Sequence, residues 1–177
     1  MQIPYLTQTA APETEPVTLA EAKLFLRIDS ETEDSLITHL IKTARQVAEE
    51  YLAKSIITQS WRLQFDFYPP EKVSLPRGPV QEIDSVVIIA QDFSETILSA
   101  SAYKLNAGNE QIFFSAAPLG QIIQINYTAG YGSAANVPAA IKHGILEHVA
   151  YMFEKRGEEE LPQNVRKLLA PYKIVRV

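Results

Sequence analysis

The sequence has no cysteine and no long hydrophobic run, and both absences exclude whole classes of protein. Without cysteine there are no disulfide bonds, thiol nucleophiles or Cys-ligated zinc sites. No apolar run approaches the roughly 20 residues that a membrane-spanning helix needs. Residues 1–5 also lack the basic and apolar regions of a secretory signal peptide. We therefore expect a soluble chain that is made inside the cell and has no membrane partner.

A basic excess is absent as well, because 16 Lys and Arg residues stand against 21 Asp and Glu residues. The net charge of -5 argues against a protein whose main task is to grip phosphate backbones. The chain of 177 residues is long enough for one domain, or for one domain with an inserted lobe. A domain of this size buries about 70% of the surface that its unfolded chain exposes, so it needs no covalent cross-links.

The first part of the chain combines a proline-containing arm with a short helical pattern. Residues 1–16 are polar and contain three prolines, which indicates an extended arm or a disordered terminus. Thr18 and Glu21 have the spacing of a capping box, in which the hydroxyl and the carboxylate each satisfy a backbone N–H. This pattern predicts a short helix over residues 19–27.

A longer helix is predicted over about residues 30–53. Ser30 and Glu33 have the spacing of a second capping box, and the acidic residues of this first turn favour the helix dipole. Apolar residues then recur at i, i+3, i+4 and i+7, which is the period of an amphipathic helix.

After Lys54 the hydrophobic period changes from that of a helix to that of a strand. Apolar and polar residues alternate over residues 61–67, as in a half-buried strand. The β-branched run at residues 86–90 predicts a strand covered on both faces. Further strands are predicted at residues 73–75, 103–105, 111–114 and 123–127. Pro138 opens a long helix that ends near Gly157, and a short helix is predicted over residues 164–170.

These predictions add up to an α+β fold, a helical bundle with a β-sheet lobe inserted between its N-terminal helix pair and its C-terminal helices. We expect an extended N-terminal arm (1–16), a single domain (17–171) and a C-terminal tail (172–177). Within that domain, helices are expected over 18–54 and 137–170, with a β-rich lobe over 56–130.

The usual patterns of catalytic, cofactor and metal sites are missing. Gly130 and Gly132 form a turn that no dinucleotide-binding fingerprint follows. His143 and His148 are five residues apart, which differs from the four-residue spacing of a helical zinc site. No serine stands in a nucleophile-elbow pattern. The sequence therefore predicts no catalytic residue, no cofactor and no metal.

Two other classes of function remain open from the residues alone. An enzyme with a cleft in the β lobe would use Tyr103, Arg77 and Glu82, although no spacing indicates a pocket. A small-ligand or carbohydrate-binding module is the second alternative, because the β lobe contains many aromatic residues. These aromatic residues alternate in phase with aliphatic ones, which is the pattern of core residues.

Several landmarks, in their order along the chain, resemble those of the head–tail connector (adaptor) proteins of tailed bacteriophages. The resemblance begins at about residue 16 and continues to the end of the chain. Its landmarks are the segments PVTLAEAK (16–23), LRID (26–29), ITQSWRL (57–63), LPRGPV (75–80), YTAGYG (127–132), VP (137–138) and LLAPY (168–172). A tryptophan that the family often carries is absent here, where Tyr151, Met152 and Phe153 stand.

The resemblance implies a structural virion protein without catalysis or cofactor. Such proteins form a homo-oligomeric ring of about a dozen copies beneath the portal and extend the DNA channel toward the tail. The implied partners are the portal protein, downstream stopper or tail proteins, and DNA that passes without specific binding. The implied location is the head–tail junction of a virion assembled in a bacterial cytoplasm, from a phage, a prophage or a gene transfer agent. The subunit alone is expected to be monomeric in solution.

The last six residues form a segment with strand-like composition. We expect this segment to dock on the portal by strand addition, with its two basic residues meeting acidic groups. The alternative is that it folds back on its own domain. The residues of this predicted binding segment are Tyr172, Lys173, Ile174, Val175, Arg176 and Val177.

Overall fold

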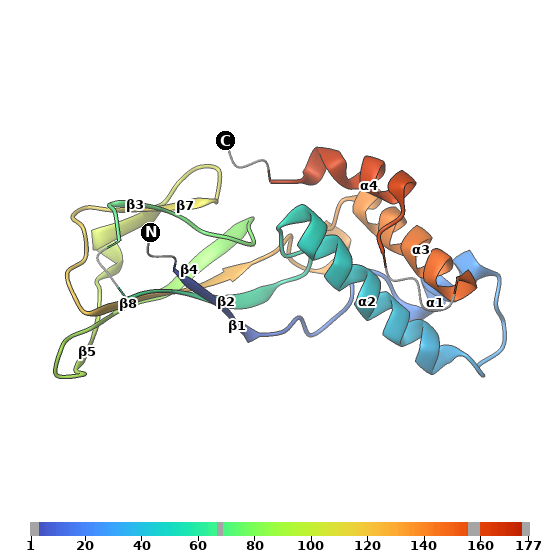
Figure 1. Ribbon diagram of the computed structural model, residues 1–177, viewed down its shortest axis with the longest axis horizontal. Coiled ribbons are helices and arrows are strands. Elements are labelled where there is room, and N and C mark those ends of the chain that lie inside the picture. Colours follow the sequence, from blue (N-terminus) through green and yellow to red (C-terminus); the bar gives the residue numbers. More distant parts are fainter. Residues whose placement is uncertain (1–3, 67–68, 156–159, 175–177) are drawn as a thin grey trace. The chain divides into compact units, whose positions relative to one another are not determined.

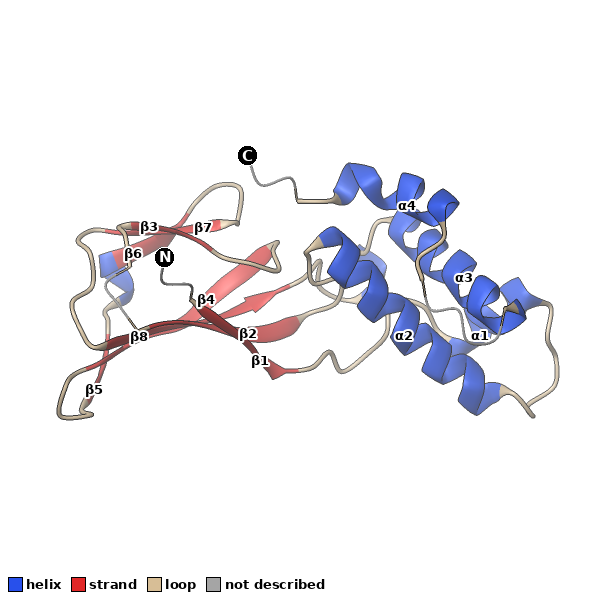
Figure 2. Cartoon of the chain, in the orientation of Figure 1, coloured by secondary structure: helices blue, strands red, loops and turns tan. Residues whose placement is uncertain are grey.

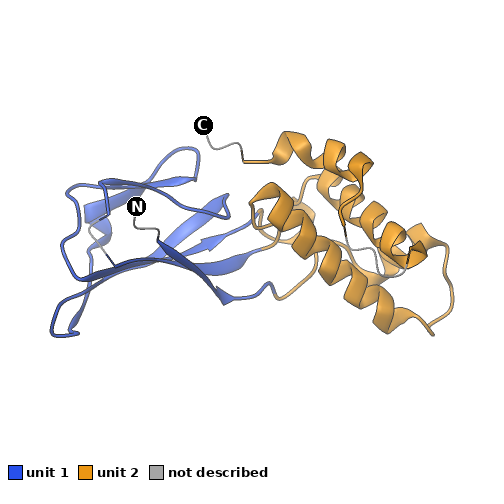
Figure 3. Cartoon of the chain, viewed as in Figure 1, with its two compact units in different colours: residues 1–12, 58–130 blue, residues 13–57, 131–177 orange. Residues whose placement is uncertain are grey.

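The computed structural model describes residues 4–66, 69–155 and 160–174, and the chain forms two compact units. Unit 1 contains residues 1–12 and 58–130, and unit 2 contains residues 13–57 and 131–177 (Figure 3). The chain therefore crosses three times between the units. Unit 1 is built of strands and unit 2 of helices, so the predicted α+β fold class is confirmed (Figure 2).

Unit 1 contains two antiparallel sheets (Figure 1). The larger one has five strands in the order β1 (Tyr5–Ala10), β2 (Gln59–Phe65), β8 (Ile122–Ala129), β4 (Val80–Ile89) and β5 (Glu95–Ile97). The smaller one has the order β3 (Lys72–Ser74), β7 (Gln111–Phe114) and β6 (Tyr103–Leu105). A short 3₁₀ helix, η1 (Ala100–Ala102), precedes β6.

The core of unit 1 is formed by alternate residues of both sheets. Ile123, Ile125 and Tyr127 of β8 are fully buried, and they pack with residues such as Ile112 of the smaller sheet. The buried Tyr127 hydroxyl donates a hydrogen bond to the Pro76 carbonyl at 2.8 Å, which satisfies its one polar atom. Burial raises the pKa of Tyr127 above its ordinary value, so this hydroxyl keeps its proton.

Strand β4 is less covered than the sequence pattern predicts. Val86 is fully buried, whereas Val87, Ile88 and Ile89 are only half-buried. The reason is that β4 has the three-residue β5 as its neighbour at the sheet edge, and every residue of β5 is exposed.

The predicted N-terminal arm contains the edge strand β1. It pairs antiparallel with β2, with Tyr5 opposite Gln64 and Gln8 opposite Trp61. The Gln8 side chain donates a 2.6 Å hydrogen bond to the Gln59 side chain, which ties this edge to the sheet.

Unit 2 contains four α-helices and two short 3₁₀ helices in its described residues. The α-helices are α1 (Leu19–Leu26), α2 (Asp34–Leu52), α3 (Ala139–Glu154) and α4 (Gln163–Leu169), and the 3₁₀ helices are η2 (Ala134–Asn136) and η3 (Ala170–Tyr172). No helix in the described part of the chain combines the length and apolar character needed to cross a membrane.

Helix α2 begins four residues later than the capping-box pattern predicts, so that prediction is wrong in detail. Ser30 accepts a hydrogen bond from the Thr32 backbone N–H at 3.1 Å, within a turn that precedes the helix. Glu33 is the residue that flanks the helix, and its side chain makes no capping bond. The Ser30 hydroxyl stabilises the local turn instead of the helix start.

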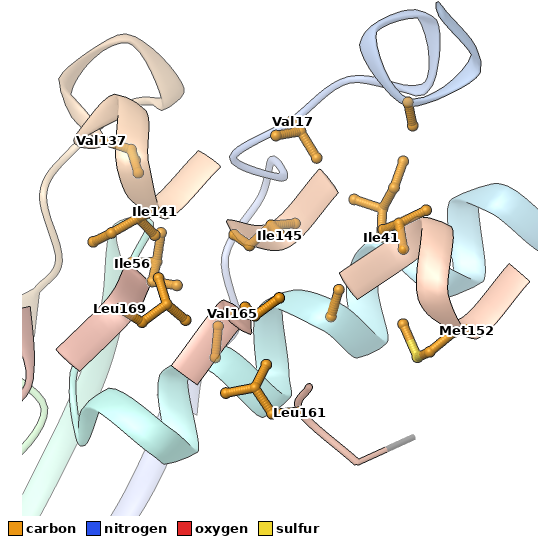
Figure 4. Close-up of a cluster of buried hydrophobic side chains, with 14 of the residues drawn as sticks. Val17, Ile41, Ile56, Val137, Ile141, Ile145, Met152, Leu161, Val165 and Leu169 are labelled. Atoms are coloured by element: carbon orange, nitrogen blue, oxygen red, sulfur yellow. The ribbon is translucent and has the colours of Figure 1, made fainter. Parts of the chain in front are cut away.

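The core of unit 2 lies where α2, α3 and α4 meet (Figure 4). Ile41, Ile145 and Val165 contribute fully or almost fully buried side chains from these three helices. Gly144 allows α3 and α4 to approach closely, since a Cβ at this position would lie 3.1 Å from Leu169 Cδ2. The short helix predicted from the sequence is therefore required to complete this core.

A buried ion network joins α2 to the segment before α1 and to the segment that follows α2. The Arg45 guanidinium donates 2.7 Å hydrogen bonds to Glu15, in the segment before α1, and to Glu49, one turn further along α2. Glu49 also accepts a 2.8 Å hydrogen bond from the Ile56 backbone N–H, after α2. Burial alone would lower the pKa of Arg45, but the two carboxylates outweigh it and raise the pKa.

We predict that Arg45→Met strongly destabilises unit 2, because it removes the guanidinium that pairs with the buried Glu49 carboxylate. Removing one partner of a buried pair costs roughly 3–5 kcal/mol of unfolding free energy. Urea denaturation followed by the helical circular dichroism signal measures the loss. Lys42→Met, at an exposed position of the same helix, is the matched control. Equal urea midpoints for the two variants would contradict the prediction.

Candidate functional site

The described residues contain no constellation of metal ligands. No three His, Asp or Glu side chains come together over residues 4–66, 69–155 and 160–174. His143 is exposed and lies 3.2 Å from Glu147 on the same helix, whereas His148 is fully buried in the core of unit 2. The two histidines therefore occupy different environments.

The three residues of the enzyme alternative do not come together in unit 1. The Tyr103 ring packs edge-on against Phe114, with 6.4 Å between ring centroids. The Arg77 guanidinium lies 5.4 Å from the centre of the Trp61 ring. Glu82 is exposed on β4. The contacts of Tyr103 and Arg77 are thus with different aromatic rings, Phe114 and Trp61.

An open pocket of about 400 Å³ lies on unit 2 near the start of α4. An ion pair of 2.6 Å between Arg166 and Glu160 is part of its lining, which is mainly polar. The lining residues are Tyr151, Glu160, Leu161, Pro162, Gln163 and Arg166. This set contains neither a nucleophile–base pair nor a group of metal ligands.

The predicted tail begins as part of unit 2. Tyr172 ends η3 and packs half-buried against the helical core. The Lys173 ammonium lies 4.6 Å from the centre of the Tyr51 ring, and the Ile174 backbone N–H donates a 3.2 Å hydrogen bond to the Leu52 carbonyl. Val175, Arg176 and Val177 lie outside the described residues.

Lysines and tyrosines gather around this start of the tail, and we call this group the tyrosine–lysine surface. Besides Lys173 on Tyr51, the Lys54 ammonium lies 5.9 Å from the centre of the Tyr131 ring. Partial burial raises the pKa of Tyr131, and its neighbour Tyr172 adds to the shift. The surface consists of Tyr51, Lys54, Tyr131, Tyr172 and Lys173.

Large apolar side chains are exposed at other places on both units. In unit 2, Leu24 and Phe25 of α1 are exposed, and the Phe25 ring lies edge-on to His143 at 5.8 Å. In unit 1, Phe93, Ile97 and Leu119 are 72–78% exposed. The sequence pattern gave no sign that Phe93, Ile97 and Leu119 are exposed, because a single apolar residue in a predicted loop does not show whether the fold covers it. Leu24 and Phe25 lie in a predicted helix, but the pattern did not show that they face away from the core.

The position of α1 and its exposed apolar residues depends on the capping box that the sequence predicts. The Glu21 backbone N–H donates to the Thr18 hydroxyl at 3.1 Å, and the Thr18 backbone N–H donates to the Glu21 carboxylate at 2.6 Å. Lys142 of α3 lies 3.2 Å from the same carboxylate. The Thr18 backbone bond is the main cause that holds the pKa of Glu21 below its ordinary value.

We predict that this cap contributes a pH-dependent part of the stability of unit 2. A carboxylate with a lowered pKa stabilises the fold above its ordinary pKa and loses that contribution as the pH falls through the lowered value. Glu21→Gln should therefore be less stable than the native chain at pH 7, and the difference should shrink as the pH falls below 4.5, the ordinary pKa of a glutamate.

Thr18→Ala removes the other half of the same cap and should cost about 1 kcal/mol at pH 7. Thermal unfolding across this pH range measures both variants, with Glu31→Gln in the exposed loop as the control. A difference between Glu21→Gln and the native chain that does not change with pH would show that the charge of Glu21 has no role.

Comparison with known proteins identifies the family. The family model described as "Head completion protein" (HCP) matches residues 15–160. No curated protein matches the sequence significantly.

Three chains in solved structures share the fold over almost their whole length. One is a chain in the neck of an empty gene transfer agent particle computed with C6 symmetry. It has a TM-score of 0.84 and 22% sequence identity, and the match covers 98% of this chain and 97% of that chain. A second, in the virion of a native gene transfer agent particle, has a TM-score of 0.81 and 23% identity, with coverage of 97% and 96%. A third, in the neck of a native particle computed with C12 symmetry, has a TM-score of 0.75 and 23% identity, with coverage of 98% and 97%.

At these identities the structural likeness shows a common fold, whereas the family match spans most of the sequence. That match also confirms the resemblance to head–tail connector proteins that the sequence landmarks indicate. The chain belongs to the head completion protein family.

Proposed function

We propose that this chain is a structural subunit of the head–tail junction of a virion. The observation that carries the proposal is the family match over residues 15–160, which includes parts of both units. The fold likeness supports it, because it extends over 97–98% of this chain to proteins of gene transfer agent particles.

In this role, copies of the chain form a ring of about a dozen subunits beneath the portal. Two of the similar structures are necks computed with C6 and C12 symmetry, which supports a rotational arrangement. Such a ring needs a head-to-tail interface, in which two different surfaces of each subunit meet. The subunit alone is monomeric, and the ring closes on the portal.

The ring extends the DNA channel toward the downstream stopper or tail proteins. DNA has to pass through such a conduit without adhering to its wall. The net charge of -5 suits that task, because an acidic subunit repels phosphates.

We predict that the purified chain, mixed with its portal protein, forms a ring coaxial with the portal channel. Electron microscopy of the mixture shows the ring and its symmetry directly. The chain without portal is the control, and it should remain monomeric by analytical ultracentrifugation. Portal particles that stay bare at saturating concentrations of the chain would overturn the proposed function, as would virions that mature normally when the gene is deleted.

The C-terminal tail is the proposed contact with the portal. Tyr172 and Ile174 are held on unit 2 by packing and by a backbone hydrogen bond, so they fix where the tail leaves the surface. Residues 175–177 continue from this point and include Arg176. We propose that the tail, Tyr172 to Val177, docks by strand addition and that Lys173 and Arg176 meet acidic groups of the portal.

We predict that truncation after Ile174 lowers co-assembly with the portal by about tenfold or more, the effect of losing roughly 1.4 kcal/mol of binding. The contacts of Tyr172, Lys173 and Ile174 remain in this variant, so its thermal midpoint should equal that of the full chain. Pull-down on immobilised portal measures the binding, with Lys167→Glu on the exposed face of α4 as the control. Undiminished binding of the truncated chain would refute a docking role for residues 175–177, Arg176 included.

A further inference from the structure

At one end of its larger sheet, unit 1 exposes both apolar and acidic side chains. We call this group of five residues the acidic tip: Phe93, Ile97, Leu119, Asp92 and Glu95. The turn between β4 and β5 carries Phe93, which is 78% exposed, and β5 carries Ile97, which is 72% exposed. Leu119, which is 73% exposed, lies at the same end, because the nearby Gln121 backbone N–H donates to the Ile89 carbonyl at the end of β4. Exposed apolar groups that gather at one place are typical of protein interaction sites.

The turn that presents Phe93 is held in a defined conformation. The Phe93 backbone N–H donates to the Ala90 carbonyl at 3.1 Å, and the Ala90 N–H donates to the Ser94 carbonyl at 3.0 Å. Phe93 itself has a φ of 64°, a left-handed conformation that is strained for a bulky residue and that recurs at functional sites. Because the backbone of the turn is already held, little backbone conformational entropy is lost there when a partner binds.

The segment that forms most of this tip carries negative charges only. Residues 78–103 contain no Lys or Arg, and the tip itself carries Asp92 and Glu95. Asp92 accepts hydrogen bonds from Ser94, whereas Glu95 is exposed on the edge strand β5. DNA or an anionic membrane would be repelled here. A fitting partner therefore offers apolar or aromatic groups together with cations.

The tyrosine–lysine surface of unit 2 has this complementary character. Tyr131 and Lys54 lie next to one another, and both are half-buried, so they offer an aromatic face and an ammonium group side by side. Tyr172 is a neighbour of Tyr131, and both rings pack against the helical core.

We propose that the acidic tip of one copy docks on the tyrosine–lysine surface of the next copy. Phe93 packs on Tyr131, and the Glu95 carboxylate pairs with the Lys54 ammonium. Because two different surfaces of the same chain meet, the contact is heterologous and repeats around a ring. This inference rests on the ring proposed above and names the surfaces that close it.

The absence of cysteine allows a direct test, because a disulfide can form only between introduced residues. One chain carries Phe93→Cys and a second, differently tagged chain carries Tyr131→Cys, so every mixed cross-link joins two copies. The two chains are mixed with the portal protein and oxidised mildly. The yield of the mixed cross-link should be about ten times the yield from a control pair, Phe93→Cys with Leu24→Cys. The reason is that an interface raises the effective concentration of the matched thiols.

Charge reversal tests the same contact by a different route. Glu95→Lys and Lys54→Glu should each reduce ring formation on the portal, and the double variant should restore it because the pair is re-formed with opposite polarity. Lys42→Glu, on the exposed face of α2, is the control and should assemble normally. Thermal midpoints equal to that of the native chain exclude loss of folding as the cause.

The outcomes separate this interface from the proposed function. Rings without the mixed cross-link, or without rescue by the double variant, overturn the interface and leave the connector role intact. Absence of rings for the native chain on its portal overturns the connector role itself. Rings together with the matched cross-link and the rescue support both.

Discussion

The buried ion network around Arg45 is the interaction on which the helical unit depends. Its two carboxylates come from different segments, Glu15 before α1 and Glu49 within α2, and Glu49 also binds the backbone of Ile56. A buried guanidinium is costly unless it is paired, so this network specifies one arrangement of the three segments. Ile56 in turn accepts a hydrogen bond from Tyr131, where the chain enters unit 2 again. Residues close to each of the three crossings between the units, Glu15, Ile56 and Tyr131, therefore take part in this network or bond to it.

Each unit has a core of its own, and this division explains how one sequence carries two kinds of surface. The helical core and the β core are separate clusters of buried residues. Gly144 lets two helices of the first core pack closely, and the Tyr127 hydrogen bond satisfies a buried hydroxyl in the second. Because neither core requires Phe93, Leu119 or Lys54, these positions are available for contacts with other molecules. A structural protein of this kind has its function on such surfaces rather than in a cleft.

Local patterns predicted much of the fold, and long-range contacts account for what they missed. The Thr18 and Glu21 cap could be predicted because both partners lie within one turn. The same pattern at Ser30 failed, since a competing turn uses its hydroxyl. The edge pairing of β1 with β2 and the exposure of Phe93 depend on residues far away in the sequence, which no local period reveals. Of the two candidate surfaces, only the acidic tip has a feature that is visible in the sequence, the absence of Lys and Arg over residues 78–103.

The net charge of -5 does not by itself decide whether copies of this chain associate. Salt screens charges beyond about 8 Å at physiological ionic strength, so the overall repulsion between neighbouring copies is weak. The charges that touch across an interface are what matter, and these are unevenly distributed. The basic residues of unit 1 are Arg62, Lys72, Arg77 and Lys104, and all four lie outside residues 78–103, the segment that forms most of the acidic tip. In unit 2, by contrast, Lys54 and Lys173 lie over tyrosine rings. An acidic protein can therefore bind its own copies through one locally matched contact.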